Sequence, residues 1–225
     1  MDIRFEDAEV RFAGRTVLLP VRLDLTERRI GIIGLNGSGK TTFARLINGL
    51  VRPSKGRILV DGLDVTAEPD AVRRQVGYIF QNPQNQIILP IVRDDIALGL
   101  KNSRLPKGEI EFRVQAMLER LSIGELGGRR AHELSGGELQ LAALAAILVT
   151  EPRLLILDEP TNQLDLRNRN RVLQTITSLP QQLIVITHDL GLLDGFDRVL
   201  LFDQGRLVGD GVPADVIAQY EALAA

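Results

Sequence analysis

The sequence predicts an α/β fold with a mainly parallel sheet, an antiparallel β subdomain at the N-terminus and an inserted helical subdomain. Three observations lead to this prediction. Along most of the chain, short apolar runs of strand length alternate with segments of helical length, an order typical of parallel sheets covered by helices. Residues 2–25 contain strand-like segments only. Between about residues 83 and 130 strand-like runs disappear, which indicates a helical insertion.

The N-terminal part contains the β subdomain and the start of the parallel sheet. Asp2 to Leu25 is expected to form short strands, broken at Ala13-Gly14 and at Pro20. The apolar run from Ile30 to Ile33 is typical of a buried strand. Further elements are expected as a helix over 40–48 and strands over 57–60 and 76–80.

Alternation of strands and helices resumes after the insertion, in which apolar residues of 109–121 recur at helical spacing. Helices are then expected over 137–149, 166–178 and 213–220, and strands over 154–157, 183–187 and 198–202. We therefore expect one domain, residues 1–225. Residues 1–82 and 150–225 would form the core with the β subdomain, and residues of about 83–149 the helical subdomain.

The composition is that of an ordinary globular domain without a strong charge bias. Of the 225 residues, 44% are hydrophobic and 25% are charged, and the formal net charge is −2. Such a charge provides no global basic field, so no nucleic-acid partner is expected. No cysteine is present for disulfides or thiolate metal sites. The longest apolar stretch, Leu141 to Val149, is far shorter than the ~20 residues that span a bilayer, so a soluble or peripheral protein is expected.

The most informative motif is a glycine-rich loop directly after the predicted strand 30–33. Its sequence, GLNGSGKTT, fits G-x-x-x-x-G-K-[ST] at every fixed position, the pattern of a P-loop NTPase core that wraps a nucleoside triphosphate. The glycines let backbone N–H groups approach phosphate oxygens, and the next helix directs its positive end there. Lys40 would reach the β- and γ-phosphates, and Thr41 would hold Mg²⁺. The alternative, a plain glycine-rich turn, does not require the Lys-Thr pair. The nucleotide-binding candidates here are Gly34, Asn36, Gly37, Ser38, Gly39, Lys40, Thr41 and Thr42.

Two adjacent acids, Asp158 and Glu159, follow the apolar run from Leu154 to Leu157. Open α/β sheets bind ligands at the carboxyl ends of parallel strands, so these acids are expected beside the phosphate loop. Asp158 is suited to hold Mg²⁺ through water, and Glu159 is suited to polarise the water that attacks the γ-phosphate. The alternative is a solvated acidic turn, which the complete phosphate loop disfavours.

A second glycine-rich helix start, Leu134-Ser135-Gly136-Gly137-Glu138, precedes a strongly apolar helix. Ser135 is a natural N-cap, and the two glycines expose backbone that suits an anion. One nucleotide can hardly use both helix starts if they lie on different lobes. The simplest arrangement is two chains, head to tail, with each phosphate loop facing the other chain's Ser135 turn. For this segment alone, an ordinary capped helix is an equal alternative.

Two single polar residues also follow predicted strands. Gln81 follows the strand 76–80, and His188, one of two histidines, follows the strand 183–187. Each is a candidate to reach a γ-phosphate, its attacking water or its metal. Taken singly, a surface amide and a capping imidazole are the simpler interpretations.

Together these motifs resemble the ATP-binding-cassette (ABC) ATPases over nearly the whole chain and in the family's order. GLNGSGKTT resembles the Walker A loop, LSGGE the family signature and LLILDE the Walker B strand with its glutamate. By this resemblance Phe12 stacks on adenine, Gln81 is the Q-loop glutamine and His188 is the switch histidine. Residues 162–165 look like the D-loop. The resemblance implies that the catalytic residues are Lys40, Gln81, Glu159 and His188. The metal would be held by Thr41, Gln81 and Asp158. The residues that act across a dimer would be Ser135, Gly136, Gly137, Glu138 and Asp165.

The resemblance further implies ATP and Mg²⁺ as cofactors and a dimer that closes on two ATP and reopens after hydrolysis. QNPQNQ after Phe80 and VRDDIALGL from Val92 look like the ATPases of energy-coupling-factor importers for vitamins or metal ions. The implied partners are a second ATPase chain, preferably a copy of this one, an integral membrane coupling protein and a substrate-binding membrane protein. The implied location is the cytoplasmic face of the cell membrane. Because little sequence follows Tyr220, compact modules such as the biotin type look most similar.

The segment from Gln84 to Ile96 is expected to dock a cytoplasmic helix of the membrane partner. Residues 87–91 are unusually apolar for a loop, and exposed apolar patches often mark partner sites. Asp94 and Asp95 are expected to meet basic residues of that partner. The alternative is that these apolar side chains fill the core between two lobes.

Three features depart from the family's usual pattern. In Leu139 to Ala143, leucine and alanine stand where the family usually has arginines. Glu138 replaces the commoner glutamine, and Arg28-Arg29 replaces Gly-Glu. None removes a phosphate, metal or water contact, but Glu138 brings a negative charge toward the bound phosphates. Two other functions stay open: the ATPase of another ABC transporter, exporters included, and a nucleotide-dependent regulatory protein with low turnover.

Overall fold

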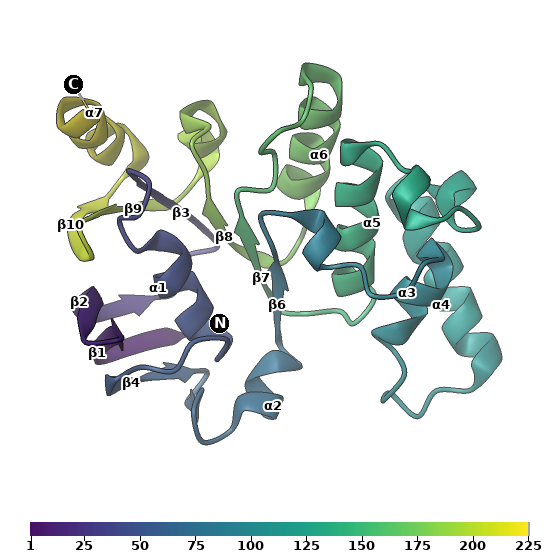
Figure 1. Ribbon diagram of the computed structural model, residues 1–225, viewed down its shortest axis with the longest axis horizontal. Helices are drawn as coiled ribbons and strands as arrows, with labels where there is room; N and C mark the ends of the chain where they lie inside the picture. Colours follow the sequence, from purple (N-terminus) through teal and green to yellow (C-terminus); the bar gives the residue numbers. More distant parts are fainter. Residues whose placement is uncertain (225) are drawn as a thin grey trace. The chain divides into compact units, whose positions relative to one another are not determined.

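The computed structural model describes residues 1–224, which divide into two compact units (Figure 1). The first unit consists of Met1–Tyr78, Arg153–Glu159 and the described residues from Gln181 onward. The second consists of Ile79–Pro152 and Pro160–Pro180. Residues 160–180, which the sequence assigns to the core, therefore group with the second unit, because their helix packs against another helix there.

The first unit is built on a six-stranded sheet in the order β10-β9-β3-β8-β7-β6. Its strands are β3 (Arg29–Gly34), β6 (Val76–Ile79), β7 (Leu154–Asp158), β8 (Gln182–Ile186), β9 (Arg198–Asp203) and β10 (Arg206–Gly211). β3, β7, β8 and β9 pair in parallel, whereas β10 is antiparallel to β9. The register aligns Ile186 with both Ile32 and Asp158. β3, β7 and β8 therefore reach the same edge of the sheet together.

Arg28 and Arg29, where the sequence departs from the family pattern, hold the start of β3 in this sheet. The Arg29 backbone N–H donates to Asp197 Oδ2 at 2.7 Å, and Arg29 Nη1 donates to the Gln181 carbonyl at 2.5 Å. The Arg28 carbonyl accepts from the Leu183 N–H at 2.8 Å. Only the Arg29 guanidinium contact depends on the side chain, so it alone gives the departure a structural role, at the end of the sheet opposite to Gly34.

The first unit also contains a four-stranded antiparallel sheet in the order β2-β1-β4-β5. Its strands are β1 (Ile3–Phe12), β2 (Arg15–Leu25), β4 (Lys55–Val60) and β5 (Leu63–Asp64). β2 continues through Pro20 as one strand, with an irregular register against β1 between Leu18 and Val21, so the break predicted there is wrong. β2 is the edge strand of this sheet, and an edge strand does not need the ladder N–H that proline lacks.

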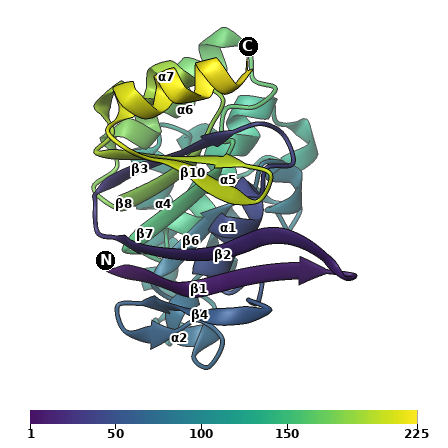
Figure 2. The same cartoon turned by 90° about the vertical axis from the view of Figure 1, so that its left-hand side faces the viewer.

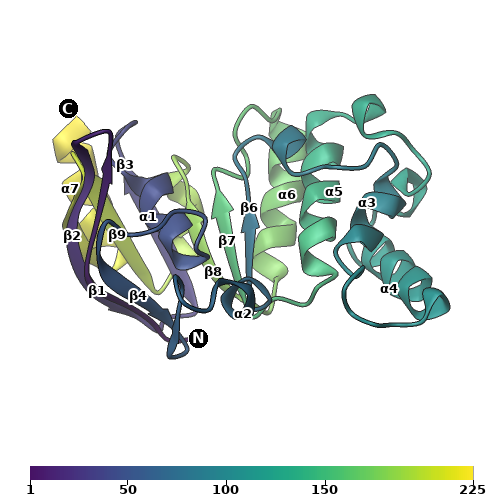
Figure 3. The ribbon, with the colours of Figure 1, turned by 60° about the horizontal axis from the view of Figure 1, so that its bottom comes forward.

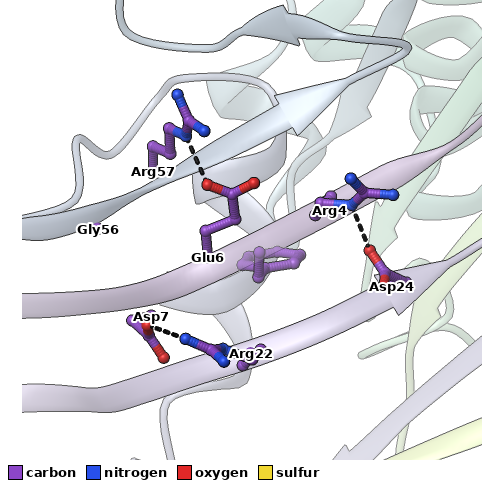
Figure 4. A pocket seen from close by; sticks show the side chains of 8 residues that line it. Arg4, Glu6, Asp7, Arg22, Asp24, Gly56 and Arg57 are labelled. Atoms are coloured by element: carbon purple, nitrogen blue, oxygen red, sulfur yellow. Dashed lines mark hydrogen bonds and ion pairs between the residues drawn. The ribbon is translucent and has the colours of Figure 1, made fainter.

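The outward face of the antiparallel sheet carries charged side chains rather than an apolar surface. Figure 4 shows three cross-strand ion pairs there, Arg4–Asp24 at 2.8 Å, Arg57–Glu6 at 2.5 Å and Arg22–Asp7 at 2.5 Å. Such exposed pairs contribute little to stability. The sheet is held instead by its inward face, which buries Ile3 and Phe5.

Helix α1 (Lys40–Ile47) lies between the two sheets of the first unit, as Figure 2 shows. Its Phe43 ring stacks on Phe5 of β1 at a centroid distance of 4.5 Å and lies 4.8 Å from Phe202 of β9. All three rings are fully buried, and buried aromatic surface contributes strongly to stability. The helix that follows the phosphate loop is thus anchored from both sides. The other helical segments of this unit are α2 (Pro69–Arg73), the 3-10 turn η4 (Leu190–Gly195) and α7 (Pro213–Ala224).

The second unit is helical, with α5 packed against its other helices (Figure 3). Its segments are α3 (Val92–Leu98), α4 (Lys107–Arg120), α5 (Gly136–Leu148), α6 (Leu166–Ser178) and the 3-10 turns η1 (Pro83–Asn85), η2 (Gly124–Leu126) and η3 (Ala131–Glu133). α5 contacts α3, α4, α6 and η1, and all of Leu139 to Ala143 is buried. A helix that is apolar on every side belongs in a core, which explains this departure from the family's basic residues. Among the residues described, no helix is both long enough and apolar enough to cross a membrane.

Candidate active site

The phosphate loop connects the end of β3 to the start of α1. Gly34 ends β3 with φ of 144°, and a Cβ there would lie 2.1 Å from the Phe202 carbonyl oxygen of β9. Gly39, the N-cap of α1, has φ of 103°. Both positions require glycine, because side chains rarely adopt such backbone angles. The loop therefore turns tightly, and the positive end of α1 is available to an anion.

Lys40 and Ser38 lie inside this loop. Lys40 Nζ donates to the carbonyl oxygens of Gly34 at 2.8 Å and Leu35 at 2.9 Å. Burial lowers the pKa of Lys40, while the charges of Glu159 and Asp158 oppose that shift. Ser38 Oγ is buried and has no hydrogen-bond partner among residues 1–224. A loop with a tethered ammonium group and an unsatisfied hydroxyl fits a phosphate ligand.

Asp158 ends β7 within hydrogen-bond distance of α1. Its Oδ1 accepts from Thr41 Oγ1 at 3.1 Å, and its Oδ2 accepts from Tyr78 Oη at 2.9 Å. Asp158 is 1% exposed, and burial raises its pKa although both hydrogen bonds oppose the rise. Within the described part of the chain, no group of three or more His, Cys, Asp or Glu side chains could hold a metal ion. One hydroxyl and one carboxylate still fit Mg²⁺, which proteins usually hold with few side chains plus substrate phosphates and water.

Glu159 and His188 meet at the same edge of the parallel sheet. Glu159 has a positive φ of 50°, and its backbone N–H donates to the Ile186 carbonyl at 2.9 Å. His188 follows β8, and its Nε2 lies 3.1 Å from Glu159 Oε1. The pairing of an acid with an imidazole beside a phosphate loop is suited to general-base chemistry on water.

The other nucleotide-binding candidates of the first unit lie at its surface or beside the loop. Phe12 ends β1 and is 52% exposed as a residue, as an adenine-stacking residue requires. Asn36 and Gly37 are exposed at the tip of the loop, and Thr42 lies half-buried in α1.

The remaining candidates belong to the second unit. Gln81 is exposed and follows β6. Ser135 is the N-cap of α5, and its Oγ accepts a hydrogen bond from the Glu138 N–H. In return, Glu138 Oε2 accepts hydrogen bonds from the Ser135 N–H and from Ser135 Oγ, both at 2.8 Å. These hydrogen bonds lower the pKa of Glu138. The Glu138 charge is thus directed at Ser135 in a capping box.

Asp165 of the D-loop segment and Gly137 of the Ser135 turn both contact Asn168, a residue that the sequence did not single out. Asp165 caps α6 by accepting a hydrogen bond from the Asn168 N–H at 2.9 Å. Its other carboxylate oxygen accepts from Asn168 Nδ2 at 2.7 Å. A Cβ on Gly137 would lie 2.5 Å from Asn168 Cγ. Gly137, Asp165 and Asn168 therefore pack as one block. A second missed residue is Tyr78, which hydrogen-bonds Asp158. A tyrosine in an otherwise apolar strand before Gln81 was the available signal.

The family profile described as "ABC transporter" matches residues 20–162. The chain belongs to the ABC transporter family. It is 60% identical over 225 residues, all of both chains, to the Biotin transport ATP-binding protein BioM of Rhizobium etli. It is 42% identical over 228 aligned residues, 99% of this chain and 80% of the relative, to the Cobalt import ATP-binding protein CbiO of Syntrophus aciditrophicus. Among solved structures, cbiO1 from Clostridium perfringens, part of the ABC transporter complex cbiONQ, covers 99% of this chain and 92% of its own with a TM-score of 0.85 and 31% identity.

Membership of the ABC family confirms the resemblance inferred from the motifs and the α/β fold predicted from the alternating pattern. The chain is an ATP-binding ATPase of that family. The individual roles of the site residues are not tested by these similarities and stay predictions.

Proposed function

We propose that this protein is the ATP-hydrolysing motor subunit of an energy-coupling-factor importer and that the importer carries biotin. The observation that supports the proposal most strongly is the 60% identity over the full length of a biotin transport ATP-binding protein. Its partners would be a membrane coupling protein and a substrate-binding membrane protein, and it would act at the cytoplasmic face of the membrane.

In this proposal the first unit performs hydrolysis. Lys40 exchanges the Gly34 and Leu35 carbonyls, which it contacts now, for γ-phosphate oxygens. Thr41, Asp158 through water and, as the resemblance implies, Gln81 would hold Mg²⁺, which would supply positive charge to the phosphates. Glu159 takes a proton from the attacking water, and His188 at 3.1 Å holds that carboxylate in place.

The second unit completes the site of another copy of the chain. Ser135, Gly136, Gly137 and Glu138 would face the γ-phosphate bound by the partner, with Asp165 beside them. The Ser135 hydroxyl now donates its hydrogen bond to Glu138. This bond has to break before the hydroxyl can donate to a phosphate. Gly137 and Asp165 pack against the same Asn168, which supports their movement as one block.

A groove in the second unit supports docking of a membrane protein's cytoplasmic helix. The groove has a volume of about 490 Å³ and is lined by Gln84, residues 87–90, Ala131, His132, Leu134 and Leu139. The Ile88 side chain is 74% exposed at this groove. An exposed isoleucine at a groove lined by both apolar and polar side chains, Gln84 and His132 among the latter, favours a partner helix that presents both kinds of side chain.

Asp95 does not belong to the exposed docking surface, contrary to the expectation from the sequence. It is 4% exposed, and its Oδ1 accepts from the backbone N–H groups of Ile88 at 2.7 Å and Leu89 at 2.8 Å. A carboxylate that satisfies two backbone donors holds the loop from inside. Asp94 is exposed and remains the one acid of the pair proposed to meet a basic partner.

The decisive experiment is uptake by the reconstituted importer. The chain would be co-purified with its membrane subunits, placed in liposomes with ATP on the side that carries the ATPase, and tested with labelled biotin and with cobalt ions. We expect ATP-dependent biotin uptake that disappears with Glu159→Gln. Cobalt uptake without biotin uptake would contradict the substrate, and a chain that recruits no membrane subunit would contradict the motor assignment.

A further inference from the structure

A chain of polar side chains leads from α1 to Asp158 Oδ2, the carboxylate oxygen that Thr41 does not contact. Tyr78 Oη donates to Asp158 Oδ2 at 2.9 Å, and the Arg45 guanidinium, one turn after Thr41 on α1, donates to the Tyr78 hydroxyl. Tyr78 is 4% exposed and Asp158 is 1% exposed. Polar groups buried to this extent are placed by their partners rather than by solvent.

The direction of these hydrogen bonds is fixed by chemistry. A guanidinium group can only donate, so Arg45 occupies a lone pair of the Tyr78 oxygen and leaves the Tyr78 proton for Asp158. The order is therefore Arg45 to Tyr78 to Asp158.

The two carboxylate oxygens of Asp158 are in this way committed to different partners. Oδ2 accepts from Tyr78 and Oδ1 accepts from Thr41 at 3.1 Å. An aspartate carboxylate otherwise rotates over a broad range, whereas Mg²⁺ demands near-ideal octahedral geometry. The hydrogen bond from Tyr78 to Oδ2 therefore keeps Oδ1 directed toward Thr41.

We propose that Tyr78 and Arg45 are positioning residues of the magnesium site and fix the rotation of the Asp158 carboxylate. The inference rests on the proposed role of Asp158 in holding Mg²⁺ through water. Residues behind a metal ligand commonly change metal affinity by about 10- to 100-fold when they are removed. They act through the ligand and need no contact with the ion.

The test measures binding of a fluorescent ATP analogue by the full chain, first in EDTA and then along a Mg²⁺ titration. For Tyr78→Phe we expect nucleotide affinity in EDTA to stay within about twofold and the half-saturating Mg²⁺ concentration to rise about 10-fold. Tyr220→Phe removes the hydroxyl of the chain's other tyrosine, on α7, and should change neither. An unchanged Mg²⁺ titration in Tyr78→Phe, or an equal loss of affinity with and without Mg²⁺, would overturn the inference.

Arg45→Gln alone tests the inference if Tyr78→Phe folds poorly, and a double-mutant cycle of the two variants tests the order of the chain. Arg45→Gln should raise the half-saturating Mg²⁺ concentration in the wild-type background and raise it less in Tyr78→Phe, because Arg45 acts through Tyr78. No effect of Arg45→Gln in the wild-type background, or equal effects in both backgrounds, would contradict the order Arg45 to Tyr78 to Asp158.

Asp158→Asn separates the proposed metal-holding role of Asp158 from the proposed positioning role of Tyr78 and Arg45. If it leaves the Mg²⁺ titration unchanged, the metal-ligand role fails. If it abolishes the Mg²⁺ effect while Tyr78→Phe and Arg45→Gln do not alter it, only the positioning inference fails.

Discussion

At the scale of single residues, Glu159 combines an unusual backbone with a direct contact. Its φ of 50° lies in a region that residues other than glycine rarely adopt. The Ile186 carbonyl holds its N–H at 2.9 Å, and His188 Nε2 lies 3.1 Å from its carboxylate. Strained residues persist where the surrounding structure holds them, commonly at functional sites. The direction of the Glu159 carboxylate is therefore set by the main chain as well as by its rotamer.

Glu159→Gln should abolish turnover and preserve ATP binding. The amide keeps the shape of the side chain but cannot accept the proton of water, so we expect steady-state ATPase activity to fall by about 10²-fold or more. Glu151→Gln is a matched control, because Glu151 also has a positive φ, of 55°, but its side chain is 77% exposed. Near-normal turnover of Glu159→Gln would refute the general-base role.

Asp94 and Asp95 should behave differently although they are neighbours. Asp95→Ala leaves the Ile88 and Leu89 N–H groups without their acceptor, and we expect a loss of about 1–3 kcal/mol in the free energy of unfolding. Asp94→Ala, at an exposed position, should change that free energy by less than about 0.5 kcal/mol and weaken only co-purification with membrane subunits. Urea denaturation and pull-down assays measure the two effects. Equal stability of both variants would show that Asp95 does not hold the loop.

At the scale of elements, α1 connects the phosphate loop to both sheets of the first unit. Phe43 lies between Phe5 of the antiparallel sheet and Phe202 of the parallel sheet. The loop residues Ser38 and Lys40 are buried at its start. The placement of Thr41 opposite Asp158 therefore depends on the aromatic packing of Phe43, two residues further along the same helix.

Phe43→Ala should destabilise the protein by about 3–5 kcal/mol, because it removes a fully buried ring and leaves a cavity. Phe112→Ala is the control, since the Phe112 side chain is 68% exposed and its loss should cost less than about 0.5 kcal/mol. Urea unfolding of both variants provides the comparison. A Phe43→Ala protein as stable as Phe112→Ala would contradict the anchoring of α1.

At the scale of the whole molecule, the candidate residues are divided between the two units. The phosphate loop, Asp158, Glu159 and His188 belong to the first unit, whereas Gln81, Ser135 and Asp165 belong to the second. The proposed head-to-tail dimer assigns each nucleotide the first unit of one chain and the Ser135 turn of the other. Hydrolysis would then be coupled to association of the chains.

The Glu159→Gln protein should dimerise when ATP and Mg²⁺ are added, because it binds ATP without consuming it. Light scattering should show a doubling of the molar mass, with the membrane subunits added if the isolated chain stays monomeric. Adding Ser135→Arg to the same protein should prevent the doubling, since arginine blocks the proposed phosphate contact. A monomer at saturating ATP and Mg²⁺ with the membrane partners present would contradict the head-to-tail dimer.

The sequence by itself determined the family and most long elements, because their signals are local. The loop Gly34 to Thr42 carries its pattern in consecutive residues, and the apolar runs of β3, β7, β8 and β9 mark buried strands of a parallel sheet. Short elements such as α2, α3, β5 and β10 were missed. Five to seven residues hold too little periodicity to be recognised as a helix, and Gly209 and Gly211 interrupt the alternation of β10.

Only the tertiary structure decided which side chains meet. Tyr78 contacts Asp158 across 80 positions, and Asp95 turns inward to Ile88 rather than outward to a partner. β2 passes through Pro20 because it lies at a sheet edge. Each outcome depends on burial and on hydrogen-bond partners that distant segments provide. A local pattern specifies which residue types are present, whereas burial in the folded chain selects the partner each polar group must find.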